Sequence, residues 1–258
     1  MAPDFYNEYY EQDILWGKQK DEKRIIFTAS LIPSDITSII DVGCGDGIML
    51  NYLQKQGRYK RLVGIDISSN ALKYVNTEKI LGSIDNIPFC DASFDLVLCL
   101  EVLEHLPYNV YPQALKELQR VSKKYILISV PNNEDIKGSF VSCPYCGCEF
   151  SPTRHLRTFS AKSVITLFPE FKLITLKFFD IRKKYIMEYY LKKIGRFLGL
   201  IEQFPHTAIC PQCGFSKPIN QETSFSKSIN WGTSLIKKLI PYRKEHKWLI
   251  ALYLKNEN

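Results

Sequence analysis

Two pairs of cysteines have the spacing of metal ligands. Cys143 and Cys146 lie in CPYCGCEF, Cys210 and Cys213 lie in CPQCGF, and a glycine follows each pair. Two thiolates three positions apart can bind one ion through a tight turn, and four of them form the tetrahedral site of a structural zinc. If the fold brings the two pairs together, they could form one Cys₄ zinc site, whose filled coordination would leave no position for a substrate or a water.

The remaining cysteines and one histidine have other expected roles. Cys148 or His155 could replace one of the four thiolates, and the alternative to a metal site is a set of unlinked reduced thiols. Cys44, Cys90 and Cys99 lie in apolar stretches. We expect those three to be small buried side chains.

A glycine-rich turn follows the first apolar segment, in SIIDVGCGDG. Glycines at such a turn let the backbone approach a ligand, and the helix that follows favours an anionic group at its N-terminus. Asp41 lies just before the turn, and Asp66 ends the next apolar segment, VGIDIS. A carboxylate at that second position can accept hydrogen bonds from both hydroxyls of a ribose. The pattern predicts a nucleoside-containing ligand.

A third group of polar residues lies in EVLEHL. Glu101, Glu104 and His105 have spacings of three and four, which would gather two carboxylates and an imidazole on one helical face. Such a group can bind a metal ion or accept a proton, and His155 in RHLRTFS is a second candidate base. Alternatively, Glu104 pairs locally and His105 is a packed loop histidine.

Alternation of helix and strand patterns predicts the elements that position these residues. Strands with nearly continuous Ile, Leu and Val are typical of a parallel sheet that helices cover on both faces, so we expect an α/β fold. The predicted strands are SIIDV, RLVGID, KILGS, FDLVLCL, YILISV, FKLITLKFF and KWLIALYL, and the predicted helices cover residues 24–32, 48–56, 70–75, 110–121 and 161–167.

Length and composition indicate a globular protein. The 258 residues are 45% apolar, but no apolar run reaches the roughly 18 residues of a membrane span. The start, MAPDFYNEYYEQD, has neither the basic nor the apolar region of a signal peptide, so we expect a cytoplasmic protein. The net charge of +7 favours anionic partners, although many proteins carry such a charge for solubility alone.

A long gap separates the last two predicted strands. A structureless loop of that length is improbable in a compact domain, so we expect an insertion with its own structure. Within it, apolar residues recur at helical spacing over residues 183–201 among lysines and an arginine. This basic amphipathic helix could contact a membrane surface or a polyanion, or it could pack on the parent domain.

Four stretches in order resemble the class I S-adenosylmethionine-dependent methyltransferases: IIDVGCGDG, LVGIDIS, IPFCDASFDLVLCLEVLEHL and ILISVPN. The resemblance covers about residues 24–180 and the last strand, and it is closest to the ubiquinone-biosynthesis O-methyltransferases and related small-molecule enzymes. It implies a Rossmann-like sheet of seven strands, of which the seventh is antiparallel and lies between the fifth and sixth.

The resemblance also implies roles for individual residues. Asp41, Gly43 and Gly45 would hold the amino-acid part of S-adenosylmethionine, and Asp66 its ribose. Ser83 stands where many relatives have an aspartate near the adenine, so Ile84 or Asp85 would read the base instead; Ile67 and Leu100 would complete the pocket. In the ubiquinone-pathway relatives, residues that match Glu101, Glu104 and His105 are associated with a divalent cation.

The implied fold also brings the two cysteine pairs together. The loop after the fifth strand and the connection from the sixth to the seventh both emerge at the carboxyl edge of the sheet, where ligands bind. We therefore expect a zinc ribbon there that shapes acceptor specificity. The expected domains are an N-terminal helical arm, 1–23; the methyltransferase domain, 24–180 and 245–258; and the zinc-ribbon and helical insertion, 140–155 and 181–244.

Three functions follow from these expectations. The first is methyl transfer to a small-molecule acceptor, such as O-methylation of a sugar, lipid-linked or quinone-like precursor. The second is methylation of ribosomal or transfer RNA with help from the zinc ribbon and the basic charge, although LEVLEHL differs from the N/D-P-P-Y/F motif of many nucleobase methyltransferases. The third is a non-catalytic zinc-ribbon interaction module on a methyltransferase scaffold.

Overall fold

The computed structural model describes residues 7, 18–185, 190, 204–205, 208–216 and 241–256. The chain divides into two compact units. The first, which we call the sheet unit, comprises Met1–Asn132, Phe159–Phe179 and Trp248–Asn258. The second, the cysteine unit, comprises Asn133–Thr158 and Asp180–Lys247.

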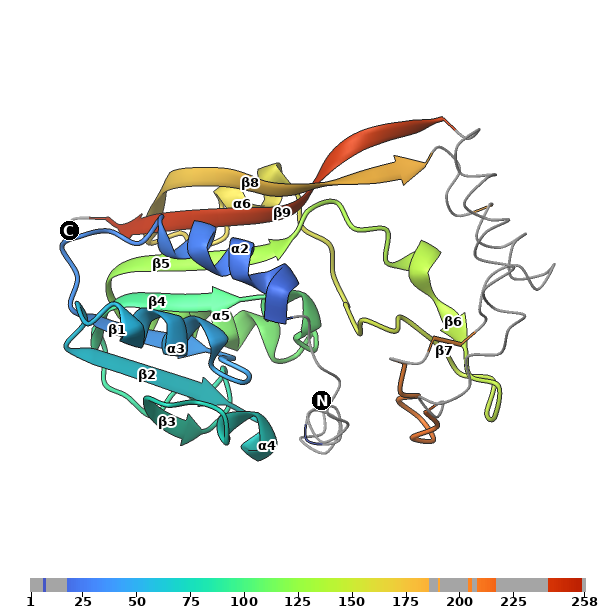
Figure 1. Cartoon of the computed structure of the whole chain (residues 1–258), viewed down its shortest axis with the longest axis horizontal. Helices are drawn as coiled ribbons and strands as arrows, with labels where there is room; N and C mark the ends of the chain where they lie inside the picture. Colours follow the sequence, from blue (N-terminus) through green and yellow to red (C-terminus); the bar gives the residue numbers. More distant parts are fainter. Residues whose placement is uncertain are drawn as a thin grey trace. The chain divides into compact units, whose positions relative to one another are not determined.

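One sheet has seven strands in the order β3-β2-β1-β4-β5-β9-β8 (Figure 1). The strands β1 to β5 pair in parallel, whereas β9 is antiparallel to β5 from Tyr125 opposite Leu254 to Pro131 opposite Trp248. The predicted α/β fold and the predicted insertion of an antiparallel last strand are therefore confirmed. The strands are β1 Ser38–Val42, β2 Arg61–Asp66, β3 Glu78–Leu81, β4 Phe94–Leu100, β5 Ser122–Pro131, β8 Phe171–Tyr185 and β9 Tyr242–Lys255.

Helices cover both faces of this sheet because alternate strand residues point to opposite faces. On one face, Ile40 and Val97 share an apolar cluster with Leu118 of α5. On the other face, Ile39 and Leu96 share a cluster with residues of α2 and α3. The helices are α2 Lys18–Ala29, α3 Ile48–Lys55, α4 Ser69–Leu72, α5 Tyr111–Val121 and α6 Ala161–Ile165, with short 3₁₀ turns at η1 Leu103–His105 and η2 Lys137–Ser139.

The described part of the cysteine unit contains a small sheet and a small apolar cluster. Strands β6 Val141–Ser142 and β7 Glu149–Phe150 pair antiparallel, and Ile209 forms an antiparallel bridge with Ser216. The buried members of the cluster are Val141, Cys143, Phe150, Phe204, Ala208 and Cys210. Two of these six are cysteines, so the thiols belong to the core of this unit.

Some predicted boundaries are wrong. Helix α2 begins at Lys18, inside the stretch assigned to the N-terminal arm, and ends at Ala29. Strand β8 continues to Tyr185, so Lys183 and Lys184 belong to a strand and not to the predicted helix over 183–201. Tyr190 is helical, and the rest of residues 186–201 lies outside the described residues. Residues 1–6 and 8–17 of the predicted arm lie outside them as well.

Among the described residues, no helix combines the length and the apolar character that crossing a bilayer requires.

Candidate functional site

The glycine turn after β1 has a backbone that other residues rarely adopt. Gly43, Gly45 and Gly47 have φ values of 78°, 55° and 74°. A Cβ atom on Gly43 would lie 2.4 Å from Cγ2 of Val102, well inside contact distance. The Gly43 amide donates a hydrogen bond of 2.8 Å to the Ile65 carbonyl oxygen, which ties the turn to β2. All three glycines are therefore favoured by their dihedral angles, and Gly43 is favoured by space as well.

Asp41 lies near the end of β1 with an unsatisfied oxygen. Its side chain is buried, and its Oδ1 has no hydrogen-bond partner among the described residues. Burial, followed by the charges of Asp66 and Asp46, raises the pKa of Asp41 from 3.8 to about 7. A buried acceptor without a partner is costly, so a ligand that donates an N–H, above all a cationic one, would be stabilised here.

Asp66, at the end of β2, is held by backbone amides. The Gly45 N–H donates to Oδ2 and the Ser68 N–H donates to Oδ1, each at 2.8 Å. Burial raises the pKa of Asp66, and hydrogen bonds from the amides of Ser68, Gly45 and Ile67 oppose that shift. Each carboxylate oxygen has a second lone pair, so this fixed carboxylate can still accept hydrogen bonds from two ligand hydroxyls.

The remaining predicted cofactor residues lie just after strands β2, β3 and β4 or at their ends. Ile67 follows Asp66, and Leu100 is the half-buried last residue of β4. After β3, Ile84 is buried, while the Ser83 hydroxyl donates to Asp85. Because these strands are parallel, their carboxyl ends meet at one edge of the sheet, beside Asp41 and the glycine turn.

A ligand with an amino group and a ribose fits these residues. The buried Oδ1 of Asp41 matches a cationic amine, the glycine turn leaves room against the backbone, and Asp66 presents fixed acceptors. The roles of the individual residues toward such a ligand remain predictions.

Glu101 is already paired with other side chains. It directly follows β4 in a left-handed conformation, with a φ of 58°. Its Oε2 lies 3.0 Å from Nη1 of Arg24, and the Ser129 hydroxyl donates to its Oε1. The Arg24 guanidinium also lies over the Trp248 ring, 4.7 Å from its centroid. The ion pair compensates the Glu101 charge, so a metal ion would have to compete with Arg24 for this carboxylate.

The helical face predicted for Glu101, Glu104 and His105 is only partly formed. Glu104 and His105 lie in the 3₁₀ turn η1, which starts at Leu103 and so excludes Glu101. Glu104 is buried and His105 is half-buried. A role of the three residues in catalysis or cation binding stays a prediction.

His155, the second candidate base, belongs to the cysteine unit. Its Nδ1 is hydrogen-bonded to the Glu134 carboxylate, a partner that the sequence analysis did not identify. A carboxylate on one ring nitrogen fixes the orientation and the tautomer of the imidazole. The signal was present as an acidic residue shortly after β5, but only tertiary structure pairs it with His155.

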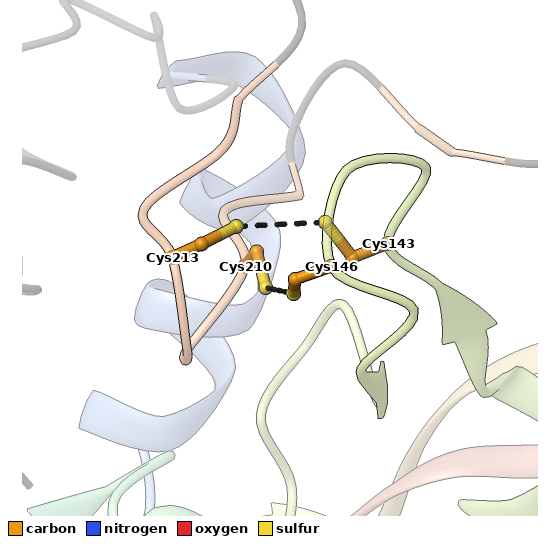
Figure 2. A group of neighbouring side chains, drawn as sticks. All are labelled: Cys143, Cys146, Cys210 and Cys213. Carbon is orange, nitrogen blue, oxygen red and sulfur yellow. Dashed lines mark hydrogen bonds between the residues drawn. The ribbon is translucent and has the colours of Figure 1, made fainter.

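The four predicted zinc ligands come together, as Figure 2 shows. Their sulfur atoms all lie within 4.8 Å of one another. The Sγ atoms of Cys143 and Cys213 are 3.7 Å apart, and those of Cys146 and Cys210 are 3.5 Å apart. This thiol set is compatible with tetrahedral zinc, and among the described residues neither Cys148 nor His155 belongs to it.

Both cysteine pairs adopt the same turn. In the first, the Gly147 N–H donates to the Cys143 carbonyl at 2.9 Å, and in the second the Gly214 N–H donates to the Cys210 carbonyl at 3.0 Å. Both glycines have positive φ, 73° and 72°. The glycine after each pair therefore permits the turn that aims two thiols at one point.

The other three cysteines follow their expectation only in part. Cys44 and Cys99 are buried, and burial raises the pKa of each thiol above its ordinary value. Cys90 is exposed, so its predicted burial is wrong. It lies in the loop between β3 and β4, where the apolar neighbours in sequence do not form a core around it.

A family of methyltransferase domains matches residues 40–127, from within β1 to within β5. This part of the chain, which contains the glycine turn, Asp41 and Asp66, is similar to a methyltransferase domain. Its predicted resemblance to the class I S-adenosylmethionine-dependent methyltransferases is thereby confirmed.

Similar proteins support this assignment. An uncharacterized protein of Methanocaldococcus jannaschii is 40% identical over 100 residues, which cover 38% of this chain and 41% of that protein. A ubiquinone biosynthesis O-methyltransferase of Albidiferax ferrireducens is 30% identical over 95 residues, covering 33% of this chain and 37% of the enzyme. The chain thus matches about two fifths of the length of these curated relatives.

The fold of the methyltransferase domain extends beyond the matched residues. A SAM-dependent methyltransferase of Thermotoga maritima superposes with a TM-score of 0.55 over 98% of this chain and 97% of that one. At 16% identity this likeness shows the fold.

Proposed function

We propose that the protein transfers the methyl group of S-adenosylmethionine to an acceptor. The observation that carries the proposal is the buried Oδ1 of Asp41, which has no partner among the described residues and lies beside the glycine turn. When bound there, S-adenosylmethionine supplies a methyl group on a sulfonium. Asp41 would accept a hydrogen bond from its amino group, and Asp66 would accept hydrogen bonds from its two ribose hydroxyls.

The acceptor is proposed to be a small molecule that is methylated on oxygen, such as a sugar, lipid-linked or quinone-like precursor. Support comes from the named relatives of the methyltransferase domain, which include ubiquinone biosynthesis O-methyltransferases. Methyl transfer is an in-line displacement, so the chain has to align the acceptor and take up its proton. His105 and His155 are the proposed proton acceptors, and the Glu134 carboxylate orients the second.

Two metal sites belong to the proposal. The four thiols of Cys143, Cys146, Cys210 and Cys213 would bind one structural zinc, with no open position for chemistry. A divalent cation at Glu101, Glu104 and His105 would have to compete with Arg24 for the Glu101 carboxylate. The zinc is thus the better supported of the two metal sites.

Incubation of the protein with fractionated cell extract and S-adenosylmethionine labelled on its methyl group tests the function. We expect label in the small-molecule or lipid fraction. Label in the RNA fraction would overturn the proposed acceptor class while leaving the cofactor assignment intact. Calorimetric measurement of S-adenosylmethionine binding distinguishes an enzyme from the third alternative, because a non-catalytic scaffold would bind no S-adenosylmethionine.

A further inference from the structure

The parts of β8 and β9 that lie in the cysteine unit form a basic ribbon. We use this name for residues 180–185 and 242–247, from two strands that are neighbours in the sheet and run in opposite directions (Figure 1). The ribbon contains six Lys and Arg residues against two acidic residues, in a chain whose total net charge is +7. More than half of the net charge of the chain therefore lies in these two short segments.

The two faces of the ribbon differ. Because side chains alternate along a strand, Arg182 and Lys184 point to the face opposite to that of Lys183. On the first face, Nη2 of Arg182 and Nζ of Lys184 lie 3.9 and 3.4 Å from Oε2 of Glu245, and Nη2 of Arg243 lies 2.6 Å from its Oε1. One carboxylate thus compensates part of the charge of this face.

The paired face also packs against its own unit. Arg182 and Lys184 each donate to the Asn133 carbonyl oxygen at 3.3 Å, and their side chains are only 30% and 23% exposed. Both cations thus form hydrogen bonds and ion pairs within the cysteine unit. They are therefore poorly placed to contact another molecule.

The opposite face is exposed and combines cations with apolar groups. Lys183 has its Nζ 4.4 Å from the centroid of the Tyr242 ring, which places both side chains on this face. Alternation adds Ile181 from β8, and Lys244 and His246 from β9. Ile181 is 59% exposed and Tyr242 is 43% exposed, and Lys183, Lys244 and His246 are exposed as well.

We propose that this exposed face of the basic ribbon binds the surface of an anionic membrane. Lysines attract acidic headgroups, a tyrosine is favoured where apolar and aqueous regions meet, and an exposed isoleucine gains from burial among acyl chains. A nucleic acid backbone would use the lysines but would gain nothing from Ile181. The mixed composition therefore favours a lipid surface over a nucleic acid.

The sequence next to the ribbon agrees with this partner. The chain that joins the two strands begins with IMEYYLKKIGRFLGLI after Tyr185 and ends with LIKKLIP before Tyr242. Both stretches are rich in apolar residues and lysine, the composition of segments that lie in a membrane interface. The proposal of membrane binding is argued from the side chains of the ribbon alone. Its consequence for catalysis rests on the proposed function: the acceptor would be an amphiphile reached at the membrane surface.

Vesicle flotation with the full-length protein tests the proposal. We expect binding to phosphatidylcholine vesicles that contain phosphatidylglycerol and much weaker binding to phosphatidylcholine alone. The double substitution Lys183→Gln and Lys244→Gln should weaken binding to the anionic vesicles about tenfold. Arg243→Gln with Lys247→Gln removes the same charge from the opposite face and should weaken it less than about threefold, because salt screens the more distant charges.

Further measurements distinguish a lipid surface from a purely electrostatic contact and from a nucleic acid. Ile181→Ser should weaken vesicle binding severalfold, which a purely electrostatic contact would not show. Absence of vesicle binding, equal effects of the two double substitutions, or tighter binding to a single-stranded RNA than to anionic vesicles would each overturn the proposal. Unchanged zinc content and S-adenosylmethionine affinity in every variant show that both units remain folded. Those two measurements also keep a failure here distinct from a failure of the proposed methyl transfer.

Discussion

The two units of the chain achieve order by different physical means. In the sheet unit, side chains such as Ile40, Val97 and Ile128 are completely buried within a sheet of seven strands. In the described part of the cysteine unit, β6 and β7 are two residues long and the buried apolar cluster has six members, two of them thiols. The described core of this unit buries little apolar surface, and the proposed zinc would add to its stability.

This contrast explains where each unit tolerates change. Burial of apolar surface is shared among many residues, so no single contact decides whether the sheet forms. A Cys₄ site concentrates stability in four atoms, and the loss of one removes most of it.

Loss of one thiol should remove the metal and unfold only one unit. For Cys210→Ser we expect zinc to fall from about one ion per chain to near zero. Amide exchange should then rise over residues 141–150 and remain slow in β1 and β4, because the sheet has its own core. The exposed Cys90 offers a matched control, since Cys90→Ser should change neither metal content nor exchange. Unchanged zinc in the Cys210 variant would remove the Cys₄ assignment.

A methyl group on the glycine turn should destabilise the sheet unit. Gly43 and Gly57 both have positive φ, but a Cβ on Gly43 would lie 2.4 Å from Val102, whereas one on Gly57 would meet no atom within 4 Å. We expect Gly43→Ala to lower the free energy of unfolding by about 3 kcal/mol and Gly57→Ala by about 1 kcal/mol. Urea unfolding measures both. Equal losses would mean that the contact with Val102 is relieved without cost.

Removal of the fixed carboxylate should weaken cofactor binding. For Asp66→Ala we expect about a 100-fold loss of S-adenosylmethionine affinity by calorimetry, the value of two hydrogen bonds to a charged group. Asp91→Ala is the control, because its carboxylate is 80% exposed and pairs with Arg120 away from the glycine turn. Binding like that of the wild type in the Asp66 variant would refute the ribose role.

The buried carboxylate of Asp41 should make the stability of the sheet unit depend on pH. Burial holds the pKa of Asp41 at about 7 in the folded chain, against 3.8 as its ordinary value. Between these values the folded state retains a proton that the unfolded state has lost, so the free energy of unfolding falls as pH rises from about 4 to about 7. Asp41→Asn removes this titration and should flatten that decline in denaturant titrations at several pH values. An unaltered slope would show that Asp41 ionises without cost.

Local sequence predicted the elements with strong periodicity and missed their ends. The seven strands follow from apolar runs such as FDLVLCL, and the order from the family resemblance. The extension of β8 to Tyr185 and the start of β9 at Tyr242 were missed, because IRKKY and YRKEH contain too few apolar residues to indicate a strand. These segments become strands because each supplies backbone partners to the other.

Some residues of the candidate site could be predicted from local sequence, and others could not. Asp41, the glycine turn, Asp66 and both cysteine pairs could be named from the sequence, because each occupies a short motif whose spacing has a chemical meaning. The ion pair between Arg24 and Glu101 and the hydrogen bond between Glu134 and His155 could not, since their partners lie far apart in the chain. From the sequence alone, Glu101 and Glu134 therefore look like available ligands or bases.

Local sequence was enough to predict the alternation of strands and helices, the glycine turn and the two thiol pairs, because each depends on residues within a few positions of one another. The three-dimensional fold determines which charges are compensated, since the strength of an electrostatic interaction depends on distance and burial. It left Asp41 with an unsatisfied oxygen, paired Glu101 with Arg24, and separated a paired from an exposed face on the basic ribbon.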